Sequence, residues 1–215
     1  MAELSFVPQR TALINVDMQN CFVHGSPISA PGGLALLERI NELATACRIA
    51  GVLVVHASHV LRADLLNAGL LAENPLIAGG IISKGSSSAE LHEGLVIEPT
   101  DVLLEKPRFG AFHGTDLELL LRSRGIDTII ISGISTNVCC DTTAREAAVR
   151  DFRVIFLNDG TATFGMGDVT AEQLQEATCA TLGLVFAQVA TIADVLAQLE
   201  QSASIPSPAP MPQPA

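Results

Sequence analysis

Two adjacent cysteines, Cys139 and Cys140, stand between an apolar run and a helical pattern in the stretch "SGISTNVCCDTTAREA" (132–147). A cysteine reacts as its thiolate, and a helix N-terminus or a nearby cation favours that form over the thiol, whose ordinary pKa is about 8.5. Adjacent helical residues do not share a face, so only one of the two can point into a pocket. The pattern therefore predicts one nucleophilic cysteine on a strand-to-helix turn, and geometry alone leaves open which one.

A carboxylate and an ammonium follow two other apolar runs. Asp17 comes directly after "TALINV", and Lys106 comes directly after "DVLLE". Asp17 could take the thiol proton and return a proton to a leaving amine, while Lys106 would keep the carboxylate ionised and favour the thiolate. Free N–H groups at the start of the helix, including that of Cys139, would face a tetrahedral oxyanion. Together these residues predict acyl transfer to sulfur, followed by hydrolysis.

The elements that must position these residues are short β-branched runs that alternate with helical patterns. The runs are interpreted as strands buried on both faces. Alternation of strand and helix requires βαβ crossovers, which build a mostly parallel sheet. The predicted fold is therefore α/β: an open, doubly wound, Rossmann-like sheet in three layers, with helices on both faces. The predicted strands span residues 11–16, 52–56, 101–105, 128–132 and 153–157, with an edge strand within 184–190.

Threonine-led start signals predict where several helices begin. Capping boxes are matched or approximated at three places, which are Thr115 with Glu118, Thr170 with Gln173, and Thr191 with Asp194. The helix after the cysteine turn is expected to run from near Val138 through residue 149. In open parallel sheets, ligands bind outside the carboxyl ends of the strands, so Asp17, Lys106 and the cysteine turn could meet at one edge.

Length and charge bound the class of protein. The 215 residues suffice for one domain, predicted over residues 1–201, and the proline-rich residues 202–215 are predicted to form an extended tail. The net charge of −11 would repel phosphate backbones and anionic membranes, so neither nucleic acid nor a membrane is expected as a partner. No apolar run could span a bilayer and no signal peptide is evident, so a cytoplasmic protein is expected.

The five cysteines lack the regular spacing of a secreted disulfide framework, which favours reduced thiols. No C-x-x-C pair is present, and His56 and His59 are too few to complete a metal shell. These two histidines are interpreted as a strand-end residue and a loop residue. Neither a metal ion nor a cofactor is expected.

Three separated motifs carry a resemblance to a known family over the chain up to about residue 199. They read "LINVDMQNCF", "EKPRFGAFHGTDLELLLRSRGI" and "IIISGISTNVCCDTTAREAAVRDFRVIFLNDGTAT", in that order. In these motifs the chain resembles the isochorismatase-like cysteine hydrolase superfamily. Within it, the chain is most similar to amidohydrolases of the N-carbamoylsarcosine amidase, ureidoacrylate amidohydrolase and biuret hydrolase type.

The resemblance implies that Asp17, Lys106 and Cys139 form a catalytic triad. It thereby selects Cys139 as the nucleophile and leaves Cys140 as a packing residue. The implied reaction is hydrolysis of a C–N bond in a small amide or carbamoyl (ureido) compound. It would pass through a thioester-type acyl-enzyme and release ammonia.

The family also has a cis peptide bond before the nucleophile turn, which would fall between Ile134 and Ser135. The N–H groups of Ser135 and Cys139 would form the oxyanion hole. The segment "HASHV" lacks the Asp-x-His ligand cluster of metal-dependent nicotinamidases, and a thiol at Cys139 argues against the vinyl-ether cleavage of true isochorismatases. Cys21 stands where relatives commonly have an acidic residue, which could alter the pocket floor.

Seven side chains beside the motifs are candidates for substrate binding, and each has a plainer alternative. The phenylalanines could wall the pocket or belong to the core. The glutamine could orient substrate or hydrogen-bond the turn backbone, and the arginine could bind a carboxylate or face solvent. Without the joint pattern, Asp17 would be a turn residue and Lys106 a solvated strand end. The seven candidates are Gln19, Phe22, Arg108, Phe109, Phe112, Asn137 and Phe164.

Alternative functions remain open on the sequence. A non-enzymatic protein could use the same fold to hold a small ligand, although all three triad residues are present. A nicotinamidase-like or isochorismatase-type hydrolase is the alternative within the family. A nucleotide-binding α/β protein would need a glycine-rich turn after the first strand, and "DMQNCF" has none. A homo-oligomer, either a dimer or a tetramer, is expected from family habit and from the mean hydropathy of +0.41.

Overall fold

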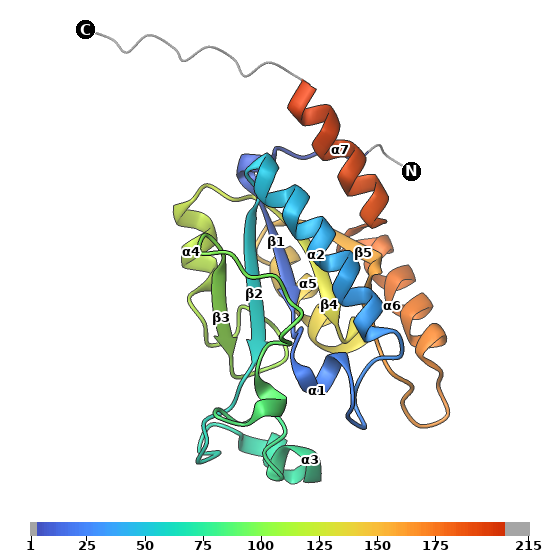
Figure 1. Cartoon of the computed structure of the whole chain (residues 1–215). Coiled ribbons are helices and arrows are strands. Elements are labelled where there is room, and N and C mark those ends of the chain that lie inside the picture. The colour runs from blue at the N-terminus through green and yellow to red at the C-terminus, as the bar shows by residue number, and fades with distance from the viewer. Residues whose placement is uncertain (1–3, 205–215) are drawn as a thin grey trace, which may run out of the picture.

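A six-stranded, entirely parallel sheet forms the centre of the computed structural model, which describes residues 4–204 (Figure 1). The strand order is β3-β2-β1-β4-β5-β6, so the chain winds outwards from β1 and then crosses back to β4. This confirms the predicted open, doubly wound α/β sheet. The strands are β1 (Thr11–Val16), β2 (Leu53–His59), β3 (Val102–Lys106), β4 (Thr128–Ile134), β5 (Arg153–Ala162) and β6 (Gln188–Ala190).

Helices cover both faces of the sheet, because alternate side chains of each strand point to opposite faces. Leu13 and Ile130 belong to the core beneath α2 and α7, whereas their neighbours Ile14 and Ile131 belong to the core beneath α4, α5 and α6. The helices are α1 (Asn20–Val23), α2 (Gly33–Ala50), α3 (Pro75–Ala78), α4 (Leu117–Ser123), α5 (Asp141–Ala148), α6 (Ala171–Val185) and α7 (Ile192–Ser204), with short helical turns at Pro8–Arg10, Gly69–Glu73, Ser87–Ala89 and Thr136–Cys140.

Several strands differ in extent from their prediction. The predicted strand stops at His56, but backbone pairing with β3 continues through Ala57 and Ser58 to His59. Pairing also extends β4 and β5 beyond their apolar runs, whereas β6 is shorter because 184–185 lie in α6. Strand β3 is not buried on both faces as predicted, since it lies at the edge of the sheet and exposes Leu103 and Glu105.

Two of the three predicted capping boxes are confirmed. Those led by Thr170 and Thr191 form reciprocal hydrogen bonds between side chain and backbone. The box led by Thr115 is wrong, because α4 begins only at Leu117. Its expected partner, Glu118, instead forms an ion pair that holds α4 against the end of α5.

The C-terminal helix extends past the predicted domain boundary. Helix α7 continues to Ser204, whereas the domain was expected to end at residue 201. The rest of the predicted proline-rich tail, residues 205–215, lies outside the described residues. Within residues 4–204, no helix combines the length and the apolar character needed to cross a membrane.

Strands β1 and β4 pair up to their carboxyl ends, where the strand order reverses, and leave no room there for a side chain at Gly133. Gly133 pairs with Val16, and a Cβ built at Gly133 would overlap the carbonyl oxygen of Val16. The backbone of Gly133 also has a φ of +119°, which L side chains rarely adopt. This glycine allows Asp17, the residue after β1, to lie beside the turn that follows β4.

We expect Gly133→Ala to lower the free energy of unfolding by about 3 kcal/mol or more, because relieving the overlap requires β1 and β4 to separate. Urea unfolding monitored by circular dichroism measures the loss. Gly125→Ala is the matched control, since its φ of +67° is also positive but nothing lies within 4 Å of an added Cβ. Equal losses in both variants would contradict a role for the close approach.

Candidate active site

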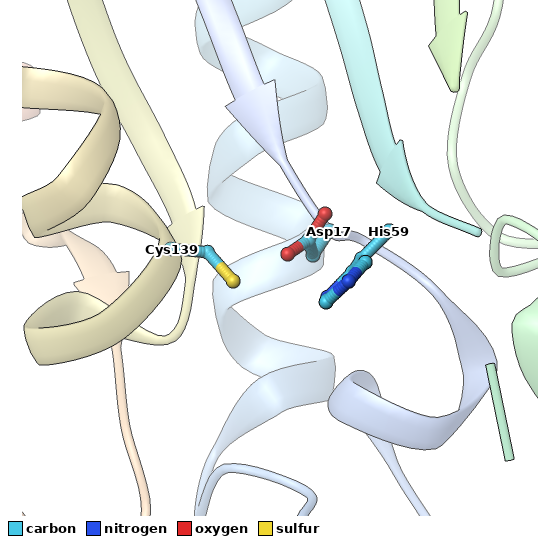
Figure 2. Close-up of side chains that lie close together, drawn as sticks. All are labelled: Asp17, His59 and Cys139. Carbon is cyan, nitrogen blue, oxygen red and sulfur yellow. The ribbon is translucent and has the colours of Figure 1, made fainter. Parts of the chain in front are cut away.

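Four polar side chains meet at the carboxyl end of the sheet. Asp17 follows β1, His59 ends β2, Lys106 ends β3, and Cys139 lies on the turn after β4. Register helps to place them, because His59 pairs with Lys106. Figure 2 shows the sulfur of Cys139 pointing toward the carboxylate of Asp17, with the imidazole of His59 alongside. The three residues predicted to converge therefore do so, and a fourth joins them.

Asp17 and Lys106 form a fully buried ion pair. Lys106 Nζ lies 2.9 Å from Asp17 Oδ2, and both side chains have 0% exposure. Burial raises the pKa of Asp17 above its ordinary value, against the opposing effect of the Lys106 charge. Burial alone would lower the pKa of Lys106, but the negative charge of Asp17 and the neighbouring Cys139 hold it above its ordinary value. Lys106 therefore stays protonated at neutral pH, and the carboxylate of Asp17 is its counter-ion.

A single π-helical turn, Thr136–Cys140, positions the thiol and leads directly into α5. The helical segment thus begins before its predicted start at Val138. The peptide bond between Ile134 and Ser135 is cis, as the resemblance implied. The carbonyl of Ser135 accepts hydrogen bonds from the N–H groups of Val138 and Cys140, at 3.2 and 3.1 Å, which closes the turn.

The two adjacent thiols have different surroundings. Cys139 faces Asp17, whereas Cys140 is fully buried in the core, with its sulfur 3.9 Å from the carbonyl oxygen of Ser132. Burial raises the pKa of Cys139, and the charge of Asp17 raises it further. The expectation that Lys106 and the helix start would favour the thiolate is therefore wrong for the resting site, because burial and the carboxylate outweigh both.

Gln19 does not have a free amide to offer a substrate. Its Oε1 accepts from the N–H of His59 at 2.7 Å, and its Nε2 donates to the carbonyls of His59 and Ala89 at 3.1 and 2.6 Å. The side chain is also fully buried. Of the two roles considered for Gln19, the structure supports hydrogen bonding to the turn backbone.

Two of the candidate phenylalanines belong to the core. Phe112 packs against Phe152, with ring centroids 5.8 Å apart. Phe22 packs with Met18 and Leu36 in a separate apolar cluster. Their assignment to substrate binding is a poor fit, because burial among apolar neighbours already explains both side chains.

The other four substrate-binding candidates differ in their surroundings. Phe109 contacts the ring of His59 edge-on, at a centroid distance of 5.7 Å, and is 39% exposed. Arg108 donates to the backbone carbonyl of Asn67 at 2.7 Å. Asn137, on the nucleophile turn, accepts from the hydroxyl of Thr163 at 2.6 Å. The half-buried Phe164 is the next residue on that segment.

Both histidines were misinterpreted from the sequence. His56 is not a strand-end residue: it is fully buried within β2, and its ring contacts Asp101 and Asn15 at 3.2 and 3.3 Å. His59 is not a loop residue but the last residue of β2, inside the site. The polar continuation of the strand hid this placement. Its register with Lys106 is the signal that could have revealed it.

Three atoms of the site could in principle hold a metal ion. Asp17, His59 and Cys139 each offer one ligand atom, and these lie within 4.8 Å of one another. However, the ammonium of Lys106 already neutralises Asp17 at 2.9 Å, and its charge would oppose a divalent cation. The donor set is therefore better suited to proton transfer than to metal binding.

The site is closed to solvent in this structure. Cys139 is only 4% exposed, and Asp17 and Lys106 have no exposed surface. A substrate therefore needs a covering group to move before it can reach the sulfur. Phe109, partly exposed and in contact with His59, lies at the boundary between site and solvent.

Comparison with known proteins places this geometry in a family. The isochorismatase domain matches residues 11–194. The chain is 32% identical to ureidoacrylate amidohydrolase RutB of Enterobacter sp. (strain 638), over 89% of this chain and 90% of that protein. Its structure is similar to that of a cysteine hydrolase from Pseudomonas syringae pv. phaseolicola 1448A, with a TM-score of 0.84 and 31% identity over 94% and 99% of the two chains.

A second solved structure gives the same result. An isochorismatase family protein from Desulfovibrio vulgaris subsp. vulgaris str. Hildenborough superposes with a TM-score of 0.78, at 30% identity over 87% of this chain and 98% of that chain. The matched region contains all six strands and the four side chains at their carboxyl ends. The chain therefore belongs to the isochorismatase family of hydrolases.

Proposed function

We propose that the protein is a cysteine-dependent amidohydrolase that cleaves a C–N bond in a small amide or carbamoyl compound and releases ammonia. The observation that carries this proposal is the buried ion pair of Asp17 and Lys106 beside the thiol of Cys139. The likeness to a ureidoacrylate amidohydrolase supports an amide-type substrate.

The first half of the reaction begins with Asp17 charged and Cys139 protonated. Asp17 Oδ2 is bonded to Lys106, whereas Oδ1 has no hydrogen bond of normal geometry within the described residues and is available to take the S–H proton. Sulfur then bonds to the substrate carbonyl carbon while the π electrons move to oxygen. Lys106 balances the negative charge throughout, so no isolated charge develops in the buried site.

The oxyanion needs hydrogen-bond donors close to the sulfur. The N–H of Ser135 makes no hydrogen bond with the described residues, and together with the N–H of Cys139 it is the proposed oxyanion hole. Collapse of the tetrahedral intermediate breaks the C–N bond, and Asp17 returns its proton to the leaving nitrogen. Ammonia leaves, and a thioester to Cys139 remains.

Water completes the cycle. Asp17, again a carboxylate, takes a proton from a water molecule that attacks the thioester carbon, and the C–S bond breaks when that intermediate collapses. The proton returns to sulfur, which restores the thiol. A carboxamide yields a carboxylic acid, whereas a carbamoyl compound yields a carbamate that decomposes to carbon dioxide and a second amine.

An ammonia-release screen tests the proposal directly. The compounds are ureido acids, biuret, carbamoyl amino acids and simple carboxamides, with carbon dioxide measured in parallel to separate carbamoyl from carboxamide substrates. Binding of these compounds without any turnover would favour the non-enzymatic alternative.

We expect Cys139→Ala to lower kcat/KM at least about a thousandfold, because the covalent route is lost. Cys140→Ala is the matched control: it removes the adjacent thiol from the core and should reduce stability while leaving turnover largely intact. Ammonia release and thermal unfolding of both variants are measured together. Comparable activity in the two variants would reject Cys139 as the nucleophile.

Breaking the buried ion pair should cost stability as well as activity. Asp17→Asn or Lys106→Met alone leaves an unpaired buried charge, and each should lower the free energy of unfolding by about 3–5 kcal/mol. The double variant leaves neither charge and should be inactive, yet more stable than either single variant. Urea unfolding of the four proteins measures the coupling, and additive losses would contradict it.

The pH dependence follows from the direction of the shifts. Burial raises the pKa of Asp17 above 3.8, and a protonated carboxyl cannot accept the thiol proton, so kcat/KM should fall as the pH drops through that raised value. The pKa of Lys106 is raised above 10.5, so its ammonium stays protonated below that pH. Deprotonation of Lys106 should therefore not lower kcat/KM in that range. A rise in kcat/KM through about pH 8.5, the ordinary thiol pKa, would instead indicate a pre-formed thiolate.

A further inference from the structure

His59 is a buried polar residue for which the mechanism above has no use. It ends β2 opposite Lys106, and only 3% of its surface is exposed. One of its ring nitrogens lies within 4.8 Å of the sulfur of Cys139 and of a carboxylate oxygen of Asp17. A buried polar group in contact range of the chemistry requires an explanation.

The position of His59 is fixed by its neighbours. Gln19 bonds both its N–H and its carbonyl, so the backbone is held on two sides. Phe109 packs against the imidazole in a T-shaped arrangement, with the ring planes at 72°. The ring therefore has a defined orientation beside the thiol (Figure 2).

The ring of His59 is neutral and, within the described part of the chain, one of its nitrogens is unpartnered. The backbone of Pro107 interacts with the ring and favours its protonated form, but this effect is outweighed. Nε2 is buried and has no hydrogen-bond partner among the described residues. With the ring proton on Nδ1, Nε2 would present a lone pair. Burial first, and then the charge of Lys106, lower the pKa of His59 to about 3, which keeps the ring neutral at physiological pH.

Two other roles for this nitrogen fit less well. A general base works best when its pKa is near the working pH, and His59 is far below it. A metal ligand would have to share Asp17 with the ammonium of Lys106. A neutral acceptor on the ring beside the reacting centre remains, and a buried acceptor is most stable when a donor satisfies it.

We propose that His59 Nε2 accepts a hydrogen bond from the N–H of the substrate group attacked by Cys139, so that the site selects an amide or carbamoyl nitrogen over an ester oxygen. This inference rests on the proposed function and names its specificity element. The hydrogen bond would also turn the lone pair of the leaving nitrogen away from His59, toward the proton carried by Asp17. An ester oxygen has no proton to offer, and it would leave Nε2 unpaired.

The test compares two reagents of similar size that differ in the group recognised. Iodoacetamide carries an NH2 where methyl iodoacetate carries an OCH3, and both alkylate thiols. The rate of modification of Cys139 is measured by mass spectrometry, and each rate is divided by that of the same reagent with N-acetylcysteine. The variants are His59→Asn, which ends before the Nε2 position, and His59→Gln, which reaches it with an acceptor. His24→Asn, on the surface, is the control.

We expect the preference of Cys139 for iodoacetamide to fall at least about tenfold in His59→Asn and less than about threefold in His59→Gln. The control should keep the wild-type preference. Should His59→Asn fail to fold, His59→Phe keeps the ring shape and the contact with Phe109 without an acceptor, and the same loss is expected.

The outcomes separate this inference from the proposed function. An unchanged preference in His59→Asn, together with ammonia release by the wild type, overturns the role of His59 and leaves the hydrolase proposal standing. A lost preference without any ammonia release supports the role of His59 and rejects amide hydrolysis. A metal ion retained by the wild type and lost in His59→Asn would overturn the role by assigning His59 to metal binding. If neither reagent modifies Cys139, both proposals fail.

Discussion

The buried ion pair between Asp17 and Lys106 is the interaction on which the rest of the site depends. Removing both charges from water is costly, and their attraction offsets the cost only in good geometry, which the 2.9 Å contact supplies. Asp17 follows β1 and Lys106 ends β3, and these two strands are not neighbours in the sheet. Strand β2 lies between them, so its last residue, His59, lies beside the ion pair.

This arrangement changes how a cysteine can be activated. In an exposed site, a helix N-terminus and a cation could hold a thiolate before the substrate arrives. Here burial and the charge of Asp17 raise the pKa of Cys139, so the resting sulfur keeps its proton. When that proton moves to Asp17 during attack, the total charge of Asp17, Lys106, Cys139 and the substrate does not change. That is less costly in a buried site than creating a free thiolate.

The backbone of the sheet supports this chemistry at close range. Gly133 lets β1 and β4 approach where a side chain would not fit, which brings Asp17 beside the nucleophile turn. Both the oxygen and the nitrogen of the Gln19 side-chain amide are hydrogen-bonded to backbone groups of His59 and Ala89. Gln19, which was a candidate for substrate contact, therefore acts indirectly, by holding the backbone of His59 in place.

The alternating fold could be predicted from the sequence, because apolar periodicity and crossover rules leave few topologies. Strand ends and family motifs also pointed to Asp17, Lys106 and Cys139. The tertiary structure alone decided the thiol's protonation, the backbone role of Gln19 and the presence of His59 in the site. The physical reason is that burial and strand register are collective: β2 continues to His59 because its neighbours offer backbone hydrogen bonds, whatever its side chains are. Likewise, a pKa depends on charges and desolvation that only the packed chain creates.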